Sequence, residues 1–271
     1  MKNLRYIVLL LIAIFTASCE DVVDVDLNTA PPKLVIDASI IWQKGTLGNE
    51  QRIKLTTTTG YYETAIPPAS GATVFITDSN NTVFTFTEYQ QSGEYFCANF
   101  LPVLNTDYVL TVVYKNETYT AKETLKPAPR IERFEQRNDG GFSGDEIEIK
   151  IFYNDNGATE DYYLTRYKPS FTAIPSFDSV SDEFFQGNQI FAFYSHEDLK
   201  SGDTLDFSIL GISKTYYNYM NILAGIVGSG GPFQTPPATL RGNVVNTTNF
   251  DNYSLGYFNV SEMDSKQYLV E

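Results

Sequence analysis

Short runs of β-branched and aromatic residues, separated by turn-forming clusters, recur along most of this chain. Ala72–Thr77 and Thr82–Glu88 flank the polar cluster Asp78–Asn81, and a second pair of runs flanks Lys115-Asn116. Two such runs around a short polar cluster predict a β-hairpin. Strands at this spacing, with no helical period between them, predict a β-sandwich.

The first part of the body, residues 33–126, contains about seven such runs, the usual number for an immunoglobulin-like or transthyretin-like β-sandwich. Lys126-Pro127-Ala128-Pro129 follows it. Two prolines in so short a stretch give a stiff, extended connector, so we expect a domain boundary here.

Residues 127–271 are predicted to form a second β-rich domain. Glu146–Tyr153 alternates strictly between polar and apolar residues, and further strands are expected after it. We expect a long irregular loop over 168–188, and a closing β-pair of Thr239–Val245 with Leu255–Val260.

One amphipathic helix is predicted near 212–227. Its apolar residues fall at helical spacing. They are Ile212, Tyr216, Tyr219, Met220, Leu223 and Val227. Gly228 and the glycines after it are expected to end the helix.

The N-terminus is predicted to be a secretory signal, residues 1–18. Lys2 and Arg5 precede the apolar run Tyr6–Phe15, which is too short to span a hydrocarbon core of ~30 Å. Small residues then lead directly to Cys19, an arrangement that resembles a bacterial lipobox. We therefore expect Cys19 to be acylated and to anchor the mature chain. Thr16 departs from the usual aliphatic residue, and an ordinary signal peptide with a chance cysteine is the alternative.

Residues 19–32 are predicted to be an acidic tether. Glu20-Asp21 and two further aspartates follow the anchor directly. Acidic residues at this place resemble the signals that send lipoproteins of Bacteroidota to the outer face of the outer membrane. The other reading is a solvated spacer that only holds the body away from the membrane.

The charge and the cysteine count exclude several classes of protein. The formal net charge is −14, and removing the two cations of the signal segment leaves −16. A strongly acidic chain is repelled by nucleic acid, so we expect no nucleic-acid partner. Only Cys19 and Cys97 are present, so the fold does not rely on a disulfide framework.

No pattern typical of catalysis is found, and we expect a non-enzymatic protein without a cofactor or metal. The single histidine, His196, stands in a Ser-capped turn and has no nucleophile motif beside it. Asn154–Gly157 with Glu160-Asp161 groups possible Ca²⁺ ligands. The EF-hand spacing is absent, and an ordinary turn is the favoured interpretation.

The high aromatic content, 19 Tyr and 19 Phe, indicates a protein-binding surface in addition to the cores. We place candidate partner contacts in the aromatic loop 168–188, at Phe171 and Phe177, and in the Pro-rich loop 231–237, at Phe233 and Pro236. Two triplets resemble O-glycan acceptor motifs of Bacteroidota, with Ser179 and Thr204 as the acceptors.

Several segments in the same order resemble a DUF4249-like family of Bacteroidota outer-membrane lipoproteins. They are Cys19–Asp21, Leu34–Ala38, Gly71–Val74, Gly93–Tyr95, Gly231–Phe233, Arg241–Val244 and Leu255–Phe258. Members are commonly encoded beside TonB-dependent transporters. The family has no catalytic residues that could be carried over.

The resemblance implies an outer-membrane accessory protein that faces the cell exterior, as a subunit or ligand-handling partner of a TonB-dependent barrel. The alternative is a surface adhesin or glycan-binding lipoprotein that acts alone.

Overall fold

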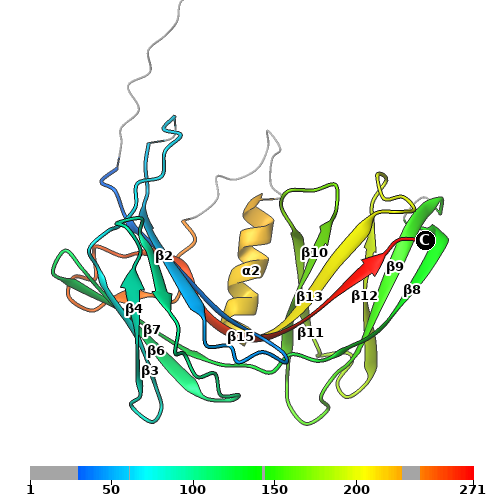
Figure 1. The fold of residues 1–271 in the computed structure, drawn as a ribbon, viewed down its shortest axis with the longest axis horizontal. Coiled ribbons are helices and arrows are strands. Elements are labelled where there is room, and N and C mark those ends of the chain that lie inside the picture. Colours follow the sequence, from blue (N-terminus) through cyan, green and yellow to red (C-terminus); the bar gives the residue numbers. More distant parts are fainter. Residues whose placement is uncertain (1–29, 61, 142–143, 228–238) are drawn as a thin grey trace, which may run out of the picture. The chain divides into compact units, whose positions relative to one another are not determined.

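Alternation of inward and outward side chains produces a structure built almost entirely of β-strands (Figure 1). The computed structural model describes residues 30–60, 62–141, 144–227 and 239–271. From Pro32 to Glu271 these residues belong to one compact unit. The predicted mainly β fold with one helix is confirmed for the part of the chain that is described.

In the described part of the unit, seven strands in the first half are followed by eight strands and the helix in the second half. In chain order the first seven are β1 (Leu34–Gln43), β2 (Gln51–Thr57), β3 (Thr73–Asp78), β4 (Val83–Glu88), β5 (Glu94–Cys97), β6 (Asp107–Tyr114) and β7 (Glu117–Thr124). The remaining elements are β8 (Ile131–Gly140), β9 (Glu146–Asn154), β10 (Tyr162–Pro169), β11 (Ser176–Ser181), β12 (Gln189–Ser195), β13 (Thr204–Ile212), α2 (Lys214–Val227), β14 (Val245–Asn246) and β15 (Leu255–Leu269).

The strand β15 joins the two halves. Twelve strands form one sheet in the order β11-β10-β13-β15-β1-β2-β5-β4-β3-β6-β7-β14, and β12-β9-β8 form a second. The first part of β15 pairs in parallel with β1, and its second part pairs antiparallel with β13. Met263 is the crossing point, because it is paired with both neighbours.

The first hydrophobic core is enclosed by β1 to β7 and the beginning of β15. Alternate residues of β1, from Leu34 to Ile40, point into it, as the period of a strand requires. Phe258 and Val260 of β15 are buried in the same core. This core is the interior of the predicted β-sandwich.

Two further cores lie in the second half. One is packed between the three-stranded sheet and one face of β10 and β13, with Tyr153, Tyr167 and Phe207 among its members. The other lies on the opposite face of the same strands, beneath α2, where Leu164 and Leu210 are buried. Both faces of β10 and β13 are therefore covered, which explains why Tyr162 to Leu164 are buried in succession.

The predicted helix is present. Ser213 precedes it, and its hydroxyl accepts a hydrogen bond from the backbone N–H of Tyr216 (3.1 Å), which makes Ser213 an N-cap. Tyr216 and Met220 are buried against the sheet, whereas Ile222 and Val227 are exposed. Figure 1 shows α2 lying across the sheet near β10 and β11.

Both predicted hairpins are confirmed. Asp78 Oδ1 accepts hydrogen bonds from the backbone N–H groups of Asn80 and Thr82, which closes the turn between β3 and β4. Lys115 and Asn116 both have positive φ (49° and 63°), as a two-residue turn between β6 and β7 requires.

The prediction of an irregular loop over 168–188 is wrong. Residues 176–181 form β11, which pairs with β10 from Tyr162 to Tyr167. Polar residues such as Asp178 and Ser179 concealed the strand. At the edge of a sheet only one side of the strand is paired and much of it stays accessible, so a clear apolar alternation is not needed.

The predicted pair of Thr239–Val245 with Leu255–Val260 is also wrong. Only Val245-Asn246 forms a strand in that segment, and it pairs with β7. Leu255–Leu269 instead pairs with β1 and β13. The polar second half of β15 hid its length. The prediction also missed β8, whose residues are mostly exposed and charged.

The proline connector between β7 and β8 is fastened to β13 and β15. The buried carboxylate of Glu262 accepts hydrogen bonds from Lys44 Nζ and from the backbone N–H of Ala128 (2.9 Å). Gly211 of β13 lies directly under the connector, where an added Cβ would be 1.9 Å from the carbonyl oxygen of Pro127. The twelve-stranded sheet runs across the predicted domain boundary, which stays a prediction.

Replacing Gly211 by Ala should destabilise the unit, because the methyl group would collide with backbone that cannot move aside. We expect a loss of ~3 kcal/mol in the free energy of unfolding. Gly225→Ala in α2 is the matched control, since its Cβ meets nothing within 4 Å and alanine favours a helix. Denaturant unfolding of both variants tests this. Equal stability of the two would contradict it.

Candidate functional site

Two of the segments that resemble the DUF4249-like family, Arg241–Val244 and Leu255–Phe258, lie against each other; Gly231–Phe233 lies outside the described residues. The amide of Asn243 donates to the carbonyl oxygen of Phe258 (2.8 Å) and accepts from its N–H (2.9 Å). A Cβ on Gly242 would be 1.6 Å from the carbonyl oxygen of Gly256. Gly256 has a positive φ (89°) and itself lies close to Ile36 of β1. These glycines permit close backbone contact.

Glu123 of β7 is the polar centre of this arrangement. It is buried, and its Oε1 accepts hydrogen bonds from Tyr257 Oη (2.8 Å), Asn243 Nδ2 (3.1 Å) and Thr215 Oγ1 (3.3 Å). Burial raises the pKa of the Glu123 carboxyl above its usual range, although these donors oppose the shift. One side chain thus connects β7, β15, the start of α2 and residue 243, which is a structural role.

Glu117, on the same strand, holds residues 246–252 in place. Its carboxylate accepts hydrogen bonds from Asn246, Asn249 and Asn252, and from Tyr119 Oη (2.7 Å). Hydrogen bonding, first from Tyr119, lowers the pKa of Glu117. Both acids of β7 therefore fasten the C-terminal segment to the first core.

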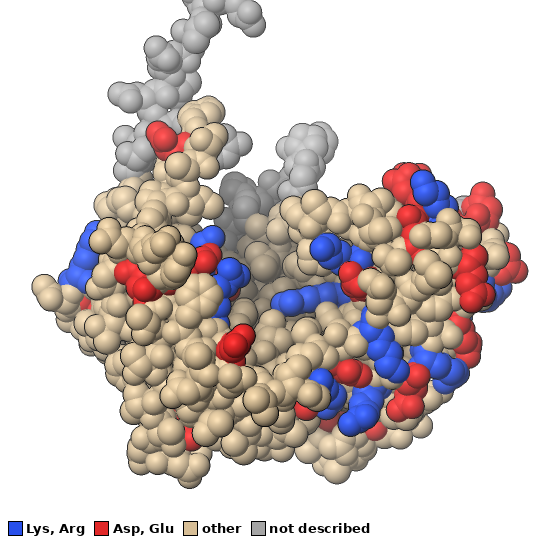
Figure 2. All heavy atoms as spheres, in the orientation of Figure 1, with Lys and Arg blue, Asp and Glu red and all other residues tan. Residues whose placement is uncertain are grey.

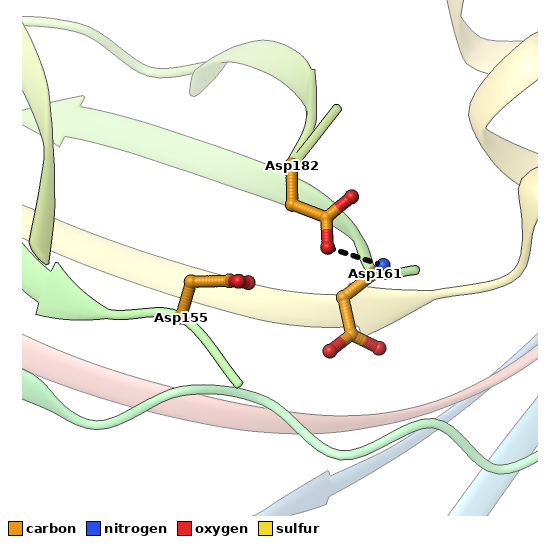
Figure 3. Close-up of side chains that lie close together, drawn as sticks. All are labelled: Asp155, Asp161 and Asp182. Carbon is orange, nitrogen blue, oxygen red and sulfur yellow. Dashed lines mark hydrogen bonds between the residues drawn. The ribbon is translucent and has the colours of Figure 1, made fainter. Parts of the chain in front are cut away.

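Three carboxylates meet at the end of β9 (Figure 3). Asp155, Asp161 and Asp182 each place an oxygen within 4.8 Å of the others, so they could hold a cation. Backbone groups already use part of this set. Asp182 Oδ2 accepts from the N–H of Asp161 (2.9 Å), and Asp155 Oδ2 accepts from the N–H of Gly187 (2.8 Å). These contacts are typical of carboxylates that stabilise loops.

Sequence reasoning found two members of this acidic cluster, Asp155 and Asp161, and missed the third. Asp182 follows β11, whose pairing with β10 brings it beside Asp161. Partial burial, and then the charges of Asp155 and Asp182, raise the pKa of Asp161.

The predicted lipid-attachment residue, Cys19, and the predicted contact residues fall in different surroundings. Cys19, Phe233 and Pro236 lie outside the described residues. Phe171 is 38% exposed, and its ring centroid lies 5.2 Å from that of His196. Phe177 is partly buried against the third core beneath α2, so of these two described phenylalanines Phe171 has the more accessible surface.

The two predicted O-glycan acceptors both belong to strands. Ser179 lies in β11 rather than in a loop, and its hydroxyl donates to Asn221 Oδ1 of α2 (2.8 Å). Thr204 is the first residue of β13 and is half-buried. Their modification stays a prediction. His196 stands in a turn, where its Nδ1 accepts from the N–H of Asp198 (3.1 Å).

The outer face of the three-stranded sheet presents aromatic and basic side chains that sequence reasoning missed. Phe191 and Phe193 of β12 are 45% and 59% exposed, and Phe191 is paired with Phe152 of β9. The Arg133 guanidinium lies 3.7 Å from the ring centroid of Phe152, and Lys150 Nζ lies 4.7 Å from that of Phe191. We call these five residues the aromatic–basic face.

The alternation of buried and exposed residues in β12 could have predicted part of this face from the sequence. Gln189–Ser195 places Ile190, Ala192 and Tyr194 in the second core, so Phe191 and Phe193 must point outward. What the sequence could not show is that Phe152 and Arg133, from two other strands, lie beside them.

Asp161→Asn should stabilise the chain at pH 7. Because folding raises the pKa of Asp161, the folded chain binds its proton more tightly than the unfolded chain does. Stability is therefore lost as pH rises from about the ordinary value of 3.8 through the raised one. The gain at pH 7 should be about 1 kcal/mol or less, since the group is partly solvated, and it should vanish below pH 3.

Thermal unfolding at both pH values measures the effect, with the exposed Asp251→Asn as control. A lower melting temperature for Asp161→Asn at pH 7 would contradict it.

We also expect Ca²⁺ to leave the unfolding temperature of the native chain unchanged, because carboxylates of the acidic cluster already accept hydrogen bonds from loop backbone groups. Binding to the folded state would raise that temperature in proportion to the concentration of Ca²⁺ relative to its dissociation constant. A clear rise with 1 mM CaCl₂ that is absent from Asp161→Asn would show that the acidic cluster binds the cation.

Among solved structures, similar chains include segments of fibronectin domains. A two-domain fibronectin type III segment of chicken tenascin is 12% identical, with 66% of this chain and 90% of that chain covered and a TM-score of 0.23. A DUF4785 family protein from Legionella pneumophila is 11% identical, with 66% and 52% covered and a TM-score of 0.27. The FN1–FN3 domains of chicken CNTN1 are 15% identical, with 68% and 63% covered and a TM-score of 0.25.

No curated protein matches the chain. Among the described residues, no helix has both the length and the apolar composition needed to cross a membrane. The family model of a domain of unknown function, DUF4249, matches residues 20–267, which is most of the chain. The chain therefore belongs to the DUF4249 family.

Proposed function

We propose that this chain is a non-enzymatic outer-membrane lipoprotein that serves as an accessory or ligand-handling partner of a TonB-dependent transporter. The observation that carries the proposal is the aromatic–basic face. Phenylalanine and arginine are enriched at protein interfaces, where aromatic rings supply contact area and guanidinium groups supply directional hydrogen bonds.

The arrangement of this face supports binding to another protein. Its rings belong to the outer surface of a sheet whose inner surface is packed in the second core, so the rings are held on rigid strands. Arg133 and Lys150 lie against the rings and reduce the contact of the aromatic surface with water. Contiguous exposed apolar patches often mark sites where another protein binds.

The location in the cell rests on the N-terminal sequence. A short apolar run followed by Cys19 supports acylation at that cysteine, and the acids after it support display at the outer face. The pairing with a TonB-dependent barrel rests on the family resemblance described above. The acidic body suits this position, since it does not adhere to anionic lipid headgroups.

Co-purification tests the proposal. We expect the native chain, expressed in its own cells and extracted from the outer membrane with detergent, to carry a TonB-dependent barrel protein with it. The double variant Phe191→Ser with Phe193→Ser should lose most of the barrel, because the contact surface loses its rings. Quantitative mass spectrometry of the purified fraction measures the ratio of barrel to lipoprotein.

The matched control replaces two exposed apolar residues elsewhere, Ile66→Ser with Phe250→Ser, which are 67% and 74% exposed. It should keep the native ratio. Recovery of the native chain without any barrel protein would count strongly against the proposal. If both double variants lose the barrel protein equally, the aromatic–basic face is not the surface that binds it.

A glycan-binding or adhesive lipoprotein that acts alone is the second candidate. The exposed phenylalanines favour it to some degree, because aromatic rings on a sheet face can stack on sugar rings. The centroids of Phe152 and Phe191 are 5.6 Å apart, but their planes are inclined by 48°, so they do not form a flat platform. Binding of the full-length chain to a polysaccharide array, undiminished when no barrel is present, would favour this candidate.

A further inference from the structure

A polar groove crosses β10, β13 and β15 on the face that α2 covers further along the strands. Its volume is about 420 Å³, within the ~300–1,000 Å³ range of small-molecule sites. The lining residues are Arg166, Lys168, Pro175, Asp206, Phe207, Ser208, Met263, Ser265, Lys266 and Gln267. Figure 2 shows Lys and Arg side chains gathered in the hollowed middle of the molecule, in the region of β10 and β13.

The strand register explains why this part of the face is polar. Arg166, Ser208 and Ser265 lie opposite one another on three neighbouring strands, and Lys168, Asp206 and Gln267 form the next row. The preceding row, Leu164, Leu210 and Met263, belongs to the core beneath α2. Beyond the helix the same face is open and carries charged and amide groups.

Two cations in the groove have no partner among the described residues. Neither Arg166 nor Lys168 forms an ion pair or a side-chain hydrogen bond there, whereas the Nζ of Lys266 donates to the carbonyl oxygen of Ile131 (2.6 Å). The one acid, Asp206, accepts a hydrogen bond from Gln267 Nε2 (2.7 Å). In a chain of formal charge −14, two neighbouring cations without an ion pair, beside a single acid, favour an anion from outside.

We propose that this groove binds a sugar acid, such as a uronic acid residue of an oligosaccharide. Arg166 and Lys168 receive the carboxylate, for which the planar guanidinium is well suited. Asp206, Gln267 and Ser208 form hydrogen bonds with the sugar hydroxyls. An acidic peptide or a polyphosphate fits less well, because neither offers hydroxyl groups to Asp206, Gln267 and Ser208.

This inference extends the ligand-handling part of the proposed function and does not depend on the barrel. The groove and the aromatic–basic face lie on different sheets and share no residue. If the chain binds the sugar acid but co-purifies with no barrel, the groove assignment stands and the transporter partnership is refuted. If it co-purifies with a barrel but does not bind the sugar acid, the partnership stands and the groove assignment is refuted.

Isothermal titration calorimetry of the full-length chain in detergent, with trigalacturonic acid as the probe, tests the proposal. We expect binding to the native chain and none of comparable strength to the uncharged trisaccharide maltotriose. Arg166→Gln with Lys168→Gln should weaken binding by about tenfold or more, the usual range for losing charge-assisted hydrogen bonds. Arg52→Gln with Lys122→Gln makes the same charge change elsewhere and should bind like the native chain.

The variant Asp206→Asn distinguishes a sugar-acid ligand from an acidic peptide ligand. It should weaken binding of the trisaccharide, because a strong hydroxyl acceptor is lost, and a tri-glutamate peptide should bind weakly to both forms. Tighter binding of the peptide than of the sugar to the native chain would overturn the proposal. So would no heat with trigalacturonic acid at millimolar concentration, equal binding of maltotriose, or equal loss in the two double variants. Unchanged thermal unfolding of each variant confirms that the fold is intact.

Discussion

The pairing of β15 with β1 on one side and β13 on the other is the interaction on which the rest of the structure depends. Its first half supplies Phe258 and Val260 to the first core, and its second half continues the sheet of the second core. The backbone N–H and C=O groups of a buried strand need hydrogen-bond partners along its whole length. The fifteen residues of β15 find these partners in strands of both halves, so β15 joins the halves into one sheet. This pairing places Leu255–Met263 beside β1, the first strand of the unit.

Buried and partly buried polar side chains strengthen that pairing. Glu123 reaches Tyr257 of β15, Glu262 reaches the connector, and Asn243 bridges the backbone of Phe258. Arg241–Val244, one of the late segments that resemble the family, thus contacts the start of β15, which contains another of them. The surfaces with exposed chemistry, the aromatic–basic face and the polar groove, lie outside them. A family can retain its fold through such contacts while its binding surfaces vary.

Sequence reasoning was most successful where structure is decided locally. The hairpin turns at Asp78–Asn81 and Lys115-Asn116, the alternation of β1 and the helix all follow from nearest-neighbour chemistry. It failed at β8, β11 and the second half of β15. Those strands are polar and partly exposed, so their partners rather than their own residues decide that they are strands.

The sequence by itself determined a mainly β chain with one amphipathic helix, an acidic character and an N-terminal pattern that resembles a lipoprotein signal. Only the tertiary structure decided which side chains meet. Asp182 joins Asp155 and Asp161 through the pairing of β11, Phe152 joins Phe191 across two strands, and Arg166 faces Ser208 and Ser265. Each contact depends on strand register. Register is set by long-range pairing, which local residue preferences do not specify.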